Sequence, residues 1–197
     1  MFGNVNIFDK RKNRGIVQKL YLVEILEASD DLKREYIVMG STGNVYRVEI
    51  SETPTCTCPD YVQRKCRCKH IYFILLRIMK ISKEMEDKQK YSNDELVTMF
   101  QNIPNITNNL IVGENIKKIY IKKKNPELLK KSKDDLCPIC IDDLENGEDL
   151  DFCKGSCGKY IHVECFSMWC KSRGIKTCVY CRANWIKESD YINLTNI

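Results

Sequence analysis

Cys137-Pro-Ile-Cys140 opens the stretch that decides the fold of this 197-residue chain, because from here on cysteine and histidine residues recur in pairs. The later pairs are Cys153 with Cys157, His162 with Cys165, and Cys178-Val-Tyr-Cys181. Apolar residues are too sparse between the pairs to build a sizeable hydrophobic core. Paired soft ligands in such a stretch are typical of a segment that folds around metal, and zinc is the default metal.

The grouping of these eight ligands determines what they build. If each four consecutive ligands shared a zinc ion, they would make two independent zinc modules. If alternate pairs shared a zinc ion, the two sites would interlock. The segment 141–152 is a loop rich in Asp, Glu and Gly, whereas residues 165–174 suit a short central helix that ends at Gly174. We therefore expect alternate pairs, with one zinc ion held by Cys137, Cys140, His162 and Cys165 and another by Cys153, Cys157, Cys178 and Cys181.

A further ligand cluster lies upstream, directly after a predicted β-hairpin. Residues 36–39 and 45–50 are rich in β-forming residues, and the segment 40–44 between them consists of turn residues. The hairpin leads into Cys56-Thr-Cys58, then Cys66-Arg-Cys68-Lys-His70, and then an apolar run that predicts a buried helix. Four ligands at a strand end and a helix start can meet at one zinc ion, which would fasten the helix to the sheet.

These upstream residues resemble the SWIM-type zinc finger. The matching motifs are Gly40-Ser-Thr-Gly-Asn-Val-Tyr46, Cys56-Thr-Cys58-Pro-Asp60 and Cys68-Lys-His70-Ile71. The resemblance implies a ββα arrangement in which Cys56, Cys58, Cys68 and His70 hold one zinc ion, and it implies binding of protein or DNA. Cys66 departs from the family pattern. Because Cys66-x-x-x-His70 is also a workable zinc spacing, Cys66 stays an alternative to Cys68 as a ligand.

The eight downstream ligands resemble the RING finger family, and more closely the RING that follows a SWIM finger in one group of ubiquitin ligases. Two matches outside the ligands add to them: Trp169, four residues after Cys165, and the motif Cys181-Arg182-x-x-Trp185. The resemblance implies a ligase that binds a ubiquitin-loaded conjugating enzyme and promotes ubiquitin transfer to a substrate lysine by positioning. The SWIM finger would then bind an unknown protein substrate or set the location.

The RING resemblance also implies roles for residues that do not bind zinc. Ile139, Trp169 and Val179 are expected to line the groove for the conjugating enzyme. Arg182 matches the cation that contacts both this enzyme and ubiquitin, which is a positioning role, and no residue is expected to be catalytic itself. Val179 stands where the family often has proline, so partner affinity or choice is expected to differ. Cys170 has no ligand partner and is expected to serve in the packing of the central helix.

Composition indicates an intracellular protein, cytoplasmic or nuclear, without a membrane span. The N-terminus lacks the apolar segment of a secretory signal, and the longest apolar run, 71–78, is interrupted by Arg77. A reducing compartment keeps thiols free, so paired cysteines are read as metal ligands and not as disulfides. The formal net charge of +5 would fall to about +1 with ten ligand thiolates and three zinc ions, so it is weak evidence for nucleic acid.

We therefore expect an α+β protein of two small zinc-stabilised domains joined by a polar linker. The predicted order is a flexible basic arm (1–14), a SWIM-type domain with its finger on an antiparallel sheet (15–81), a linker with one short helix (82–134), a cross-brace RING finger (135–190) and a tail (191–197). Residues 18–27 fit a short helix that passes into a strand. The linker helix is expected at 94–101, with Ser92 or Asn93 as its cap.

Two other functions stay open. Both fingers could scaffold partners without catalysis, because many RING folds bind no conjugating enzyme productively. A nucleic-acid-binding regulator, as a secondary possibility, could use the cations of 64–80 and the basic segment 117–124. Residues 56–80 hold six basic residues and one acidic residue, but these cations could equally offset the thiolate charge.

Overall fold

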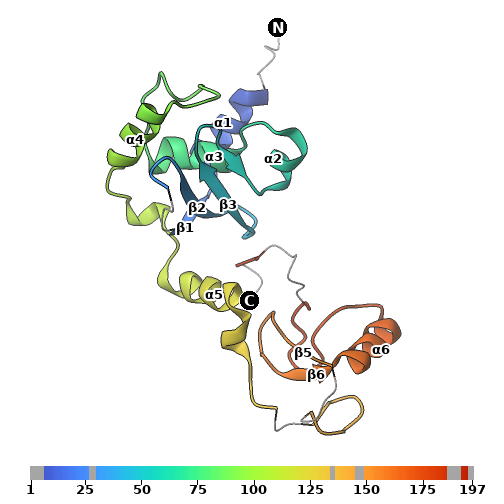
Figure 1. The fold of residues 1–197 in the computed structure, drawn as a ribbon. Helices are drawn as coiled ribbons and strands as arrows, with labels where there is room; N and C mark the ends of the chain where they lie inside the picture. Colours follow the sequence, from blue (N-terminus) through green and yellow to red (C-terminus); the bar gives the residue numbers. More distant parts are fainter. Residues whose placement is uncertain (1–6, 27–29, 134–135, 145–148, 186–191, 195–197) are drawn as a thin grey trace. The chain divides into compact units, whose positions relative to one another are not determined.

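A computed structural model describes residues 7–26, 30–133, 136–144, 149–185 and 192–194 (Figure 1). The chain divides into two compact units, which are described one at a time. Unit 1 comprises residues 1–117 and 193–197, and unit 2 comprises residues 118–192. The division falls within helix α5 (Glu114–Lys124). No helix in the described ranges is both long and apolar enough to cross a membrane.

Unit 1 is built on a four-stranded antiparallel sheet in the order β1-β2-β3-β4. Its strands are β1 (Tyr21–Ile25), β2 (Arg34–Met39), β3 (Val45–Ile50) and β4 (Thr55–Cys56). The predicted hairpin is confirmed, with Val38 opposite Tyr46 and Tyr36 opposite Val48. Gly43 has φ 81° in the connecting turn, a conformation that glycine adopts without strain. The chain before β1 is wrongly predicted as helical, because residues 18–20 form no helix.

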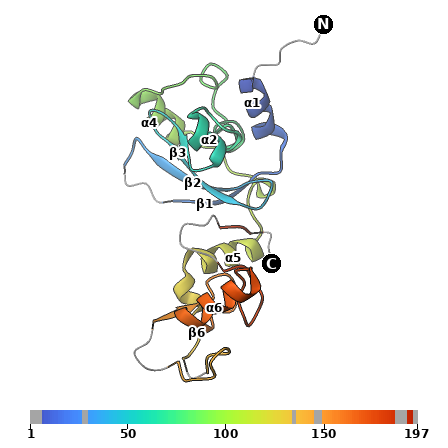
Figure 2. The ribbon, with the colours of Figure 1, turned by 90° about the vertical axis from the view of Figure 1, so that its right-hand side faces the viewer.

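Helices cover one side of this sheet, as Figures 1 and 2 show. They are α1 (Ile7–Val17), α2 (Pro59–Arg64), α3 (Lys69–Phe73), its π-helical continuation η1 (Ile74–Ile78), and α4 (Asn93–Gln101). The predicted buried helix is α3 with η1, and most of its residues are buried inside the unit. The shared core is made by Tyr36, Val38, Val48 and Ile50 from the sheet and by Ile71, Phe73, Ile74, Leu75 and Ile78 from this helix.

Helix α1 occupies residues that the sequence predicts as a flexible arm. Of that arm, residues 1–6 lie outside the described ranges, and from Ile7 onward the chain is helical. Arg11 is buried and its Nε donates to Asp60 Oδ2 at 2.9 Å. The helix also packs closely on α3, since a Cβ at Gly15 would lie 2.7 Å from Tyr72 Cβ. The prediction is wrong here because these basic residues have long-range partners, which local sequence does not reveal.

The predicted linker is also shorter than expected. Helix α4 begins after Ser92, whose side chain and Glu95 form a reciprocal capping box. The helix buries Leu96, Met99 and Phe100 in the core of unit 1. Residues up to 117 therefore belong to unit 1, including η2 (Asn108–Leu110). The prediction of a polar linker is wrong here because these three apolar residues of α4 lie on one face of the helix and are buried.

Unit 2 has little regular structure. It contains the end of α5, η3 (Pro126–Leu129), the two-stranded sheet β5 (Leu150–Phe152) and β6 (Tyr160–His162), and helix α6 (Val163–Arg173). The predicted central helix is confirmed as α6, and it ends at Gly174 with φ 66°. The core cluster of this unit is made by Cys137, Leu144, Ile161 and Cys165 among the described residues. Half of these four residues are predicted metal ligands.

The segment before the first cysteine pair packs against the turn after Cys157, within unit 2. The backbone N–H of Lys131 donates to the Gly158 carbonyl oxygen at 3.2 Å. A Cβ at Gly158 would lie 1.5 Å from the Leu129 carbonyl oxygen, and Gly158 has φ 72°. Residues 129–131 thus brace the turn that carries Cys157, and this part of the predicted linker belongs to the downstream unit.

Candidate metal centres

Cysteine and histidine side chains meet in three groups of four. The groups are Cys56, Cys58, Cys68 and His70; Cys137, Cys140, His162 and Cys165; and Cys153, Cys157, Cys178 and Cys181. Within each group the potential ligand atoms all lie within 4.8 Å of one another. The two groups of unit 2 take alternate pairs along the chain. Every residue that the sequence predicts as a preferred zinc ligand thus lies in one of the groups.

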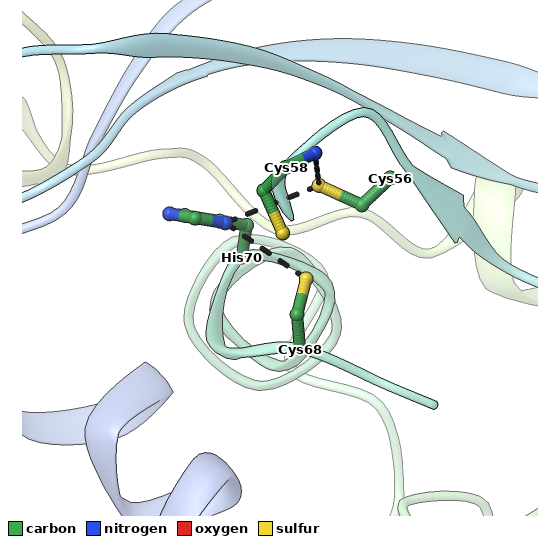
Figure 3. Close-up of side chains that lie close together, drawn as sticks. All are labelled: Cys56, Cys58, Cys68 and His70. Atoms are coloured by element: carbon green, nitrogen blue, oxygen red, sulfur yellow. Dashed lines mark hydrogen bonds between the residues drawn. The ribbon is translucent and has the colours of Figure 1, made fainter. Parts of the chain in front are cut away.

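The first group joins the sheet of unit 1 to its buried helix. Cys56 ends β4, Cys58 precedes α2, and Cys68 and His70 lie at the start of α3. Figure 3 shows the three sulfur atoms and the ring of His70 turned toward one another. His70 Nδ1 lies 3.9 Å from the sulfur of Cys56 and 3.8 Å from the sulfur of Cys68. All four residues are buried.

The two groups of unit 2 draw on loops, β6 and α6. His162 Nδ1 lies 3.3 Å from the sulfur of Cys140 and 3.9 Å from that of Cys165. His162 ends β6, and Cys165 lies in the first turn of α6. In the other group, Cys153 and Cys181 have their sulfur atoms 3.8 Å apart, and the sulfur atoms of Cys157 and Cys178 are 3.7 Å apart.

These distances fit tetrahedral zinc. With zinc–sulfur bonds of about 2.3 Å, neighbouring sulfur atoms of a tetrahedral site lie about 3.8 Å apart. A disulfide would bring two sulfur atoms to about 2.05 Å, and the twelve cysteines are free. The donor sets, three cysteines with one histidine and four cysteines, are those of structural zinc sites. Zinc is therefore the cofactor that all three groups fit.

The histidine ring of the first group is oriented as a metal ligand. His70 Nδ1 faces the thiols, and its Nε2 is buried with no hydrogen-bond partner among the residues described. Tyr46 packs on the ring at a centroid distance of 4.6 Å, and a Cβ at Gly40 would lie 3.2 Å from Nε2. The ring is therefore held by packing, with its Nδ1 lone pair available to zinc.

Crowding of the thiols shifts their pKa values in opposite directions. Hydrogen bonds from Cys56 and Cys68 lower the pKa of Cys58, while the contact with Cys58 raises the pKa of Cys56. The hydrogen bond with Cys178 lowers the pKa of Cys153 to about 4, and the pKa of Cys178 is raised by the same contact. Thiols this close do not all ionise unless a cation lies between them. A divalent ion would stabilise every thiolate in the group.

Two cysteines lie outside the groups. Cys66 is half-buried, and its thiol donates to the Arg64 carbonyl oxygen at 3.2 Å. The first group in the described structure contains Cys68 in its place. Cys170 is half-buried on α6 and likewise belongs to none of the groups found among the described residues.

The four predicted partner-binding residues fall in two places on unit 2. Ile139 and Val179 are half-buried and pack against the same small core cluster. Trp169 lies on α6, and the guanidinium carbon of Arg182 lies 5.4 Å from the centre of its ring. Arg182 is exposed and has φ 63°. The structure thus brings Arg182 to Trp169 across a gap of thirteen positions in sequence.

Sequence reasoning missed residues that surround these sites. The guanidinium carbon of Arg173 lies 4.8 Å from the ring centre of Trp169, which its spacing of four residues on a helix could have indicated. Trp185 stacks on Phe166 at 3.9 Å and donates from Nε1 to Asp151 Oδ2 at 3.2 Å. No local signal reveals this second set of contacts, because Asp151 is far away in sequence.

Arg67 is a further missed residue, and it lies between Cys66 and Cys68. It is buried, donates to the carbonyl oxygens of Glu86 and Lys88, and stacks on Tyr91 at 5.2 Å. Because Arg67 is the direct neighbour of Cys68, these contacts link the first metal group to the segment before α4.

Comparison with known families identifies part of the chain. The family model described as SWIM zinc finger matches residues 46–79, which include the whole first metal group. This chain thus contains a SWIM zinc finger. No solved structure matches the chain significantly.

Two curated relatives extend the comparison. Human mitogen-activated protein kinase kinase kinase 1 is 24% identical over 207 residues, which cover 93% of this chain and 13% of that protein. A mouse protein named E3 ubiquitin-protein ligase Zswim2 is 27% identical over 128 residues, which cover 61% of this chain and 20% of that protein. The chain therefore spans a small part of each of these relatives.

Proposed function

We propose that this chain, with a SWIM zinc finger followed by two interleaved metal groups, is a RING-type ubiquitin ligase. The observation that carries the proposal is the grouping of eight ligands in alternate pairs, because this grouping corresponds to the cross-brace of a RING finger. The similarity to a mouse protein named as a ubiquitin ligase supports the same function. The other relative is named as a kinase, but the match to this chain covers only 13% of that protein.

The proposed chemistry is catalysis by positioning. Ubiquitin arrives as a thioester on a conjugating enzyme, and the zinc module binds that enzyme and restrains the thioester for attack by a substrate lysine. Positioning alone supplies large accelerations, since it removes the entropic cost of orienting the reacting groups. The zinc ions hold the loops of unit 2 in place, and no residue of this chain acts as a nucleophile.

The surface for the conjugating enzyme is proposed to include Ile139, Trp169 and Val179. Unit 2 also exposes large apolar side chains that could extend this surface: Ile141 is 71% exposed and Met168 is 57% exposed. Arg182 is proposed to contact both the conjugating enzyme and ubiquitin. Its stacking on Trp169 would restrict the guanidinium before the partner arrives, so less entropy is lost on binding.

The SWIM finger is proposed to bind the protein substrate or to set the location of the ligase. The partners are then a conjugating enzyme, ubiquitin and an unknown substrate, all inside the cell, in the cytoplasm or the nucleus. A non-catalytic scaffold built from the same two fingers is the competing function. It differs in one respect: it binds partners without stimulating transfer.

Nucleic-acid binding is a weaker candidate for the basic segment 64–80, because four of its six cations have hydrogen-bond partners among the described residues of unit 1. Arg64 pairs with Asp60 at 2.6 Å, and Arg67 is buried. Lys69 donates to Gln18 Oε1 at 2.7 Å, and Arg77 donates to the Gln18 carbonyl oxygen at 3.0 Å. The two contacts to Gln18 hold α3 and η1 to the residue that follows α1, and the Arg64 pair lies within α2, so the charges have a structural use.

A panel of conjugating enzymes tests the proposal. The wild-type chain, with its bound zinc counted, is expected to form self-ubiquitinated products with at least one enzyme. Ile139→Ala is expected to abolish these products while the zinc content stays at three per chain. Failure with every enzyme of a broad panel, by a chain that holds three zinc ions, would favour the scaffold.

A further inference from the structure

The end of the described chain lies on the β2–β3 turn of unit 1. The backbone N–H of Leu194 donates to the Gly43 carbonyl oxygen at 2.9 Å, and Asn193 pairs with Asn44 in an antiparallel bridge. Leu194 is only 1% exposed, and Gly43 is buried. The sequence predicts a tail at 191–197, but these two residues are held against unit 1 in a β-type contact.

The side chain of Asn193 adds a specific contact. Its Nδ2 donates to the Thr42 carbonyl oxygen at 3.1 Å and to Asn44 Oδ1 at 2.6 Å. An amide nitrogen carries two N–H donors, and both acceptors face it. An aspartate at the same position would direct a carboxylate at two oxygen atoms, so the contact selects for an amide.

Residues 193 and 194 lie beside the turn that leads into β3. Strand β4 pairs with β3 at Val48 and Glu49, which lie further along the strand. Near Asn44, residues 193 and 194 supply the neighbouring backbone. Addition of an extended segment to a sheet edge is a common mode of peptide recognition, in which backbone bonds give affinity and side chains give specificity.

We propose that the β2–β3 turn of unit 1 is a docking site for an extended peptide that carries asparagine followed by a large aliphatic residue. Asn193 and Leu194 fill this site in cis. A segment of the same chain competes at high effective concentration, so a partner binds well only when this segment is displaced. The proposal concerns peptide binding by unit 1 and holds whether or not the chain transfers ubiquitin.

A variant that releases the chain's own segment tests the site. Leu194→Asp places a charge at a buried position, so the segment should leave the turn. A fluorescent peptide with the sequence Tyr-Ile-Asn-Leu-Thr-Asn-Ile, residues 191–197, is then titrated and its anisotropy followed. We expect the variant to bind this peptide at least about tenfold more tightly than the wild-type chain does. A peptide with aspartate in place of the asparagine equivalent to Asn193 should bind about tenfold more weakly or not at all.

Variants on the acceptor side provide matched controls in the Leu194→Asp background. Asn44→Ala removes one acceptor and should weaken binding of the peptide about tenfold. Asn44→Asp keeps an acceptor and should retain binding of the peptide. Folding is checked by a zinc count of three, and Asn193→Asp replaces Leu194→Asp as the releasing variant if the latter fails this check. Equal binding by the wild-type and released chains would overturn the proposal, and so would equal binding of the asparagine and aspartate peptides.

Discussion

Cys66 and Cys68 lie two positions apart and have different surroundings. Cys68 is fully buried beside His70, whereas the thiol of Cys66 points to a backbone carbonyl. Both spacings to the histidine suit zinc, so local sequence alone does not choose between them. The choice depends on where the chain enters α3, and the N-terminal residue of that helix follows Cys68 directly.

Replacement of each cysteine by serine tests this assignment. Cys68→Ser is expected to lower the zinc content from three ions per chain to two, because a ligand of a buried site is lost. Cys66→Ser is the matched control and is expected to keep three. Zinc is counted by elemental analysis after gel filtration. Loss of an ion from the Cys66 variant instead would reverse the assignment.

The helices and strands differ in how well local sequence predicts them. The hairpin, the buried helix α3 and the central helix α6 carry local signals: turn residues, an apolar run and a terminal glycine. Helix α4 carries one too, because the predicted helix and its Ser92 cap are both present, but its burial in the core of unit 1 has no local signal. Helix α1 carries no local signal, because contacts between distant residues stabilise it. Arg11 with Asp60 is such a contact, across 49 positions. The ligand groups were predictable because few residue types bind zinc at these spacings.

A test of the α4 cap is Ser92→Ala. The substitution removes the acceptor for the Glu95 backbone N–H and breaks the capping box. The free energy of unfolding of unit 1 is expected to fall by about 1 kcal/mol in denaturant titrations. Gln101→Ala, at the exposed end of the same helix, should change it by less than about 0.5 kcal/mol. Equal effects of the two substitutions would argue against a stabilising cap.

The turn after Cys157 offers a comparison between two glycines. Gly158 and Gly174 both have φ near 70°, but a Cβ meets the Leu129 backbone only at Gly158. Gly174→Ala should cost about 1 kcal/mol, the price of the left-handed backbone alone. Gly158→Ala should cost clearly more, and it should hasten zinc loss to a chelator, because residues 129–131 must move. Similar zinc loss from both variants would show that this bracing segment is dispensable.

At the scale of the whole molecule, the two units depend on zinc to different degrees. Unit 1 has a core that runs through its sheet, α3, η1 and α4. In the described part of unit 2, the core cluster holds only four buried residues, and two of them, Cys137 and Cys165, are themselves candidate ligands. A small core cannot offset the conformational entropy of its chain, so unit 2 should require zinc in order to fold.

Chelation is expected to separate the two units. Both tryptophans of the chain, Trp169 and Trp185, lie in unit 2 and report on it alone. A strong chelator should shift their emission fully to that of exposed indole, while the amides of β2 and β3 stay partly protected from hydrogen exchange. Simultaneous loss of both signals would mean that the units fold as one.

The central claim is tested most directly by the rate at which ubiquitin leaves a loaded conjugating enzyme for free lysine. We expect the wild-type chain with three zinc ions to accelerate this discharge, and Arg182→Ala to lower the acceleration about tenfold or more, equivalent to about 1.4 kcal/mol of transition-state stabilisation. Lys171→Ala, which removes an exposed cation from α6, should leave the rate unchanged. An unaltered rate in the Arg182 variant, or no acceleration by the wild-type chain, would contradict a RING-type ligase.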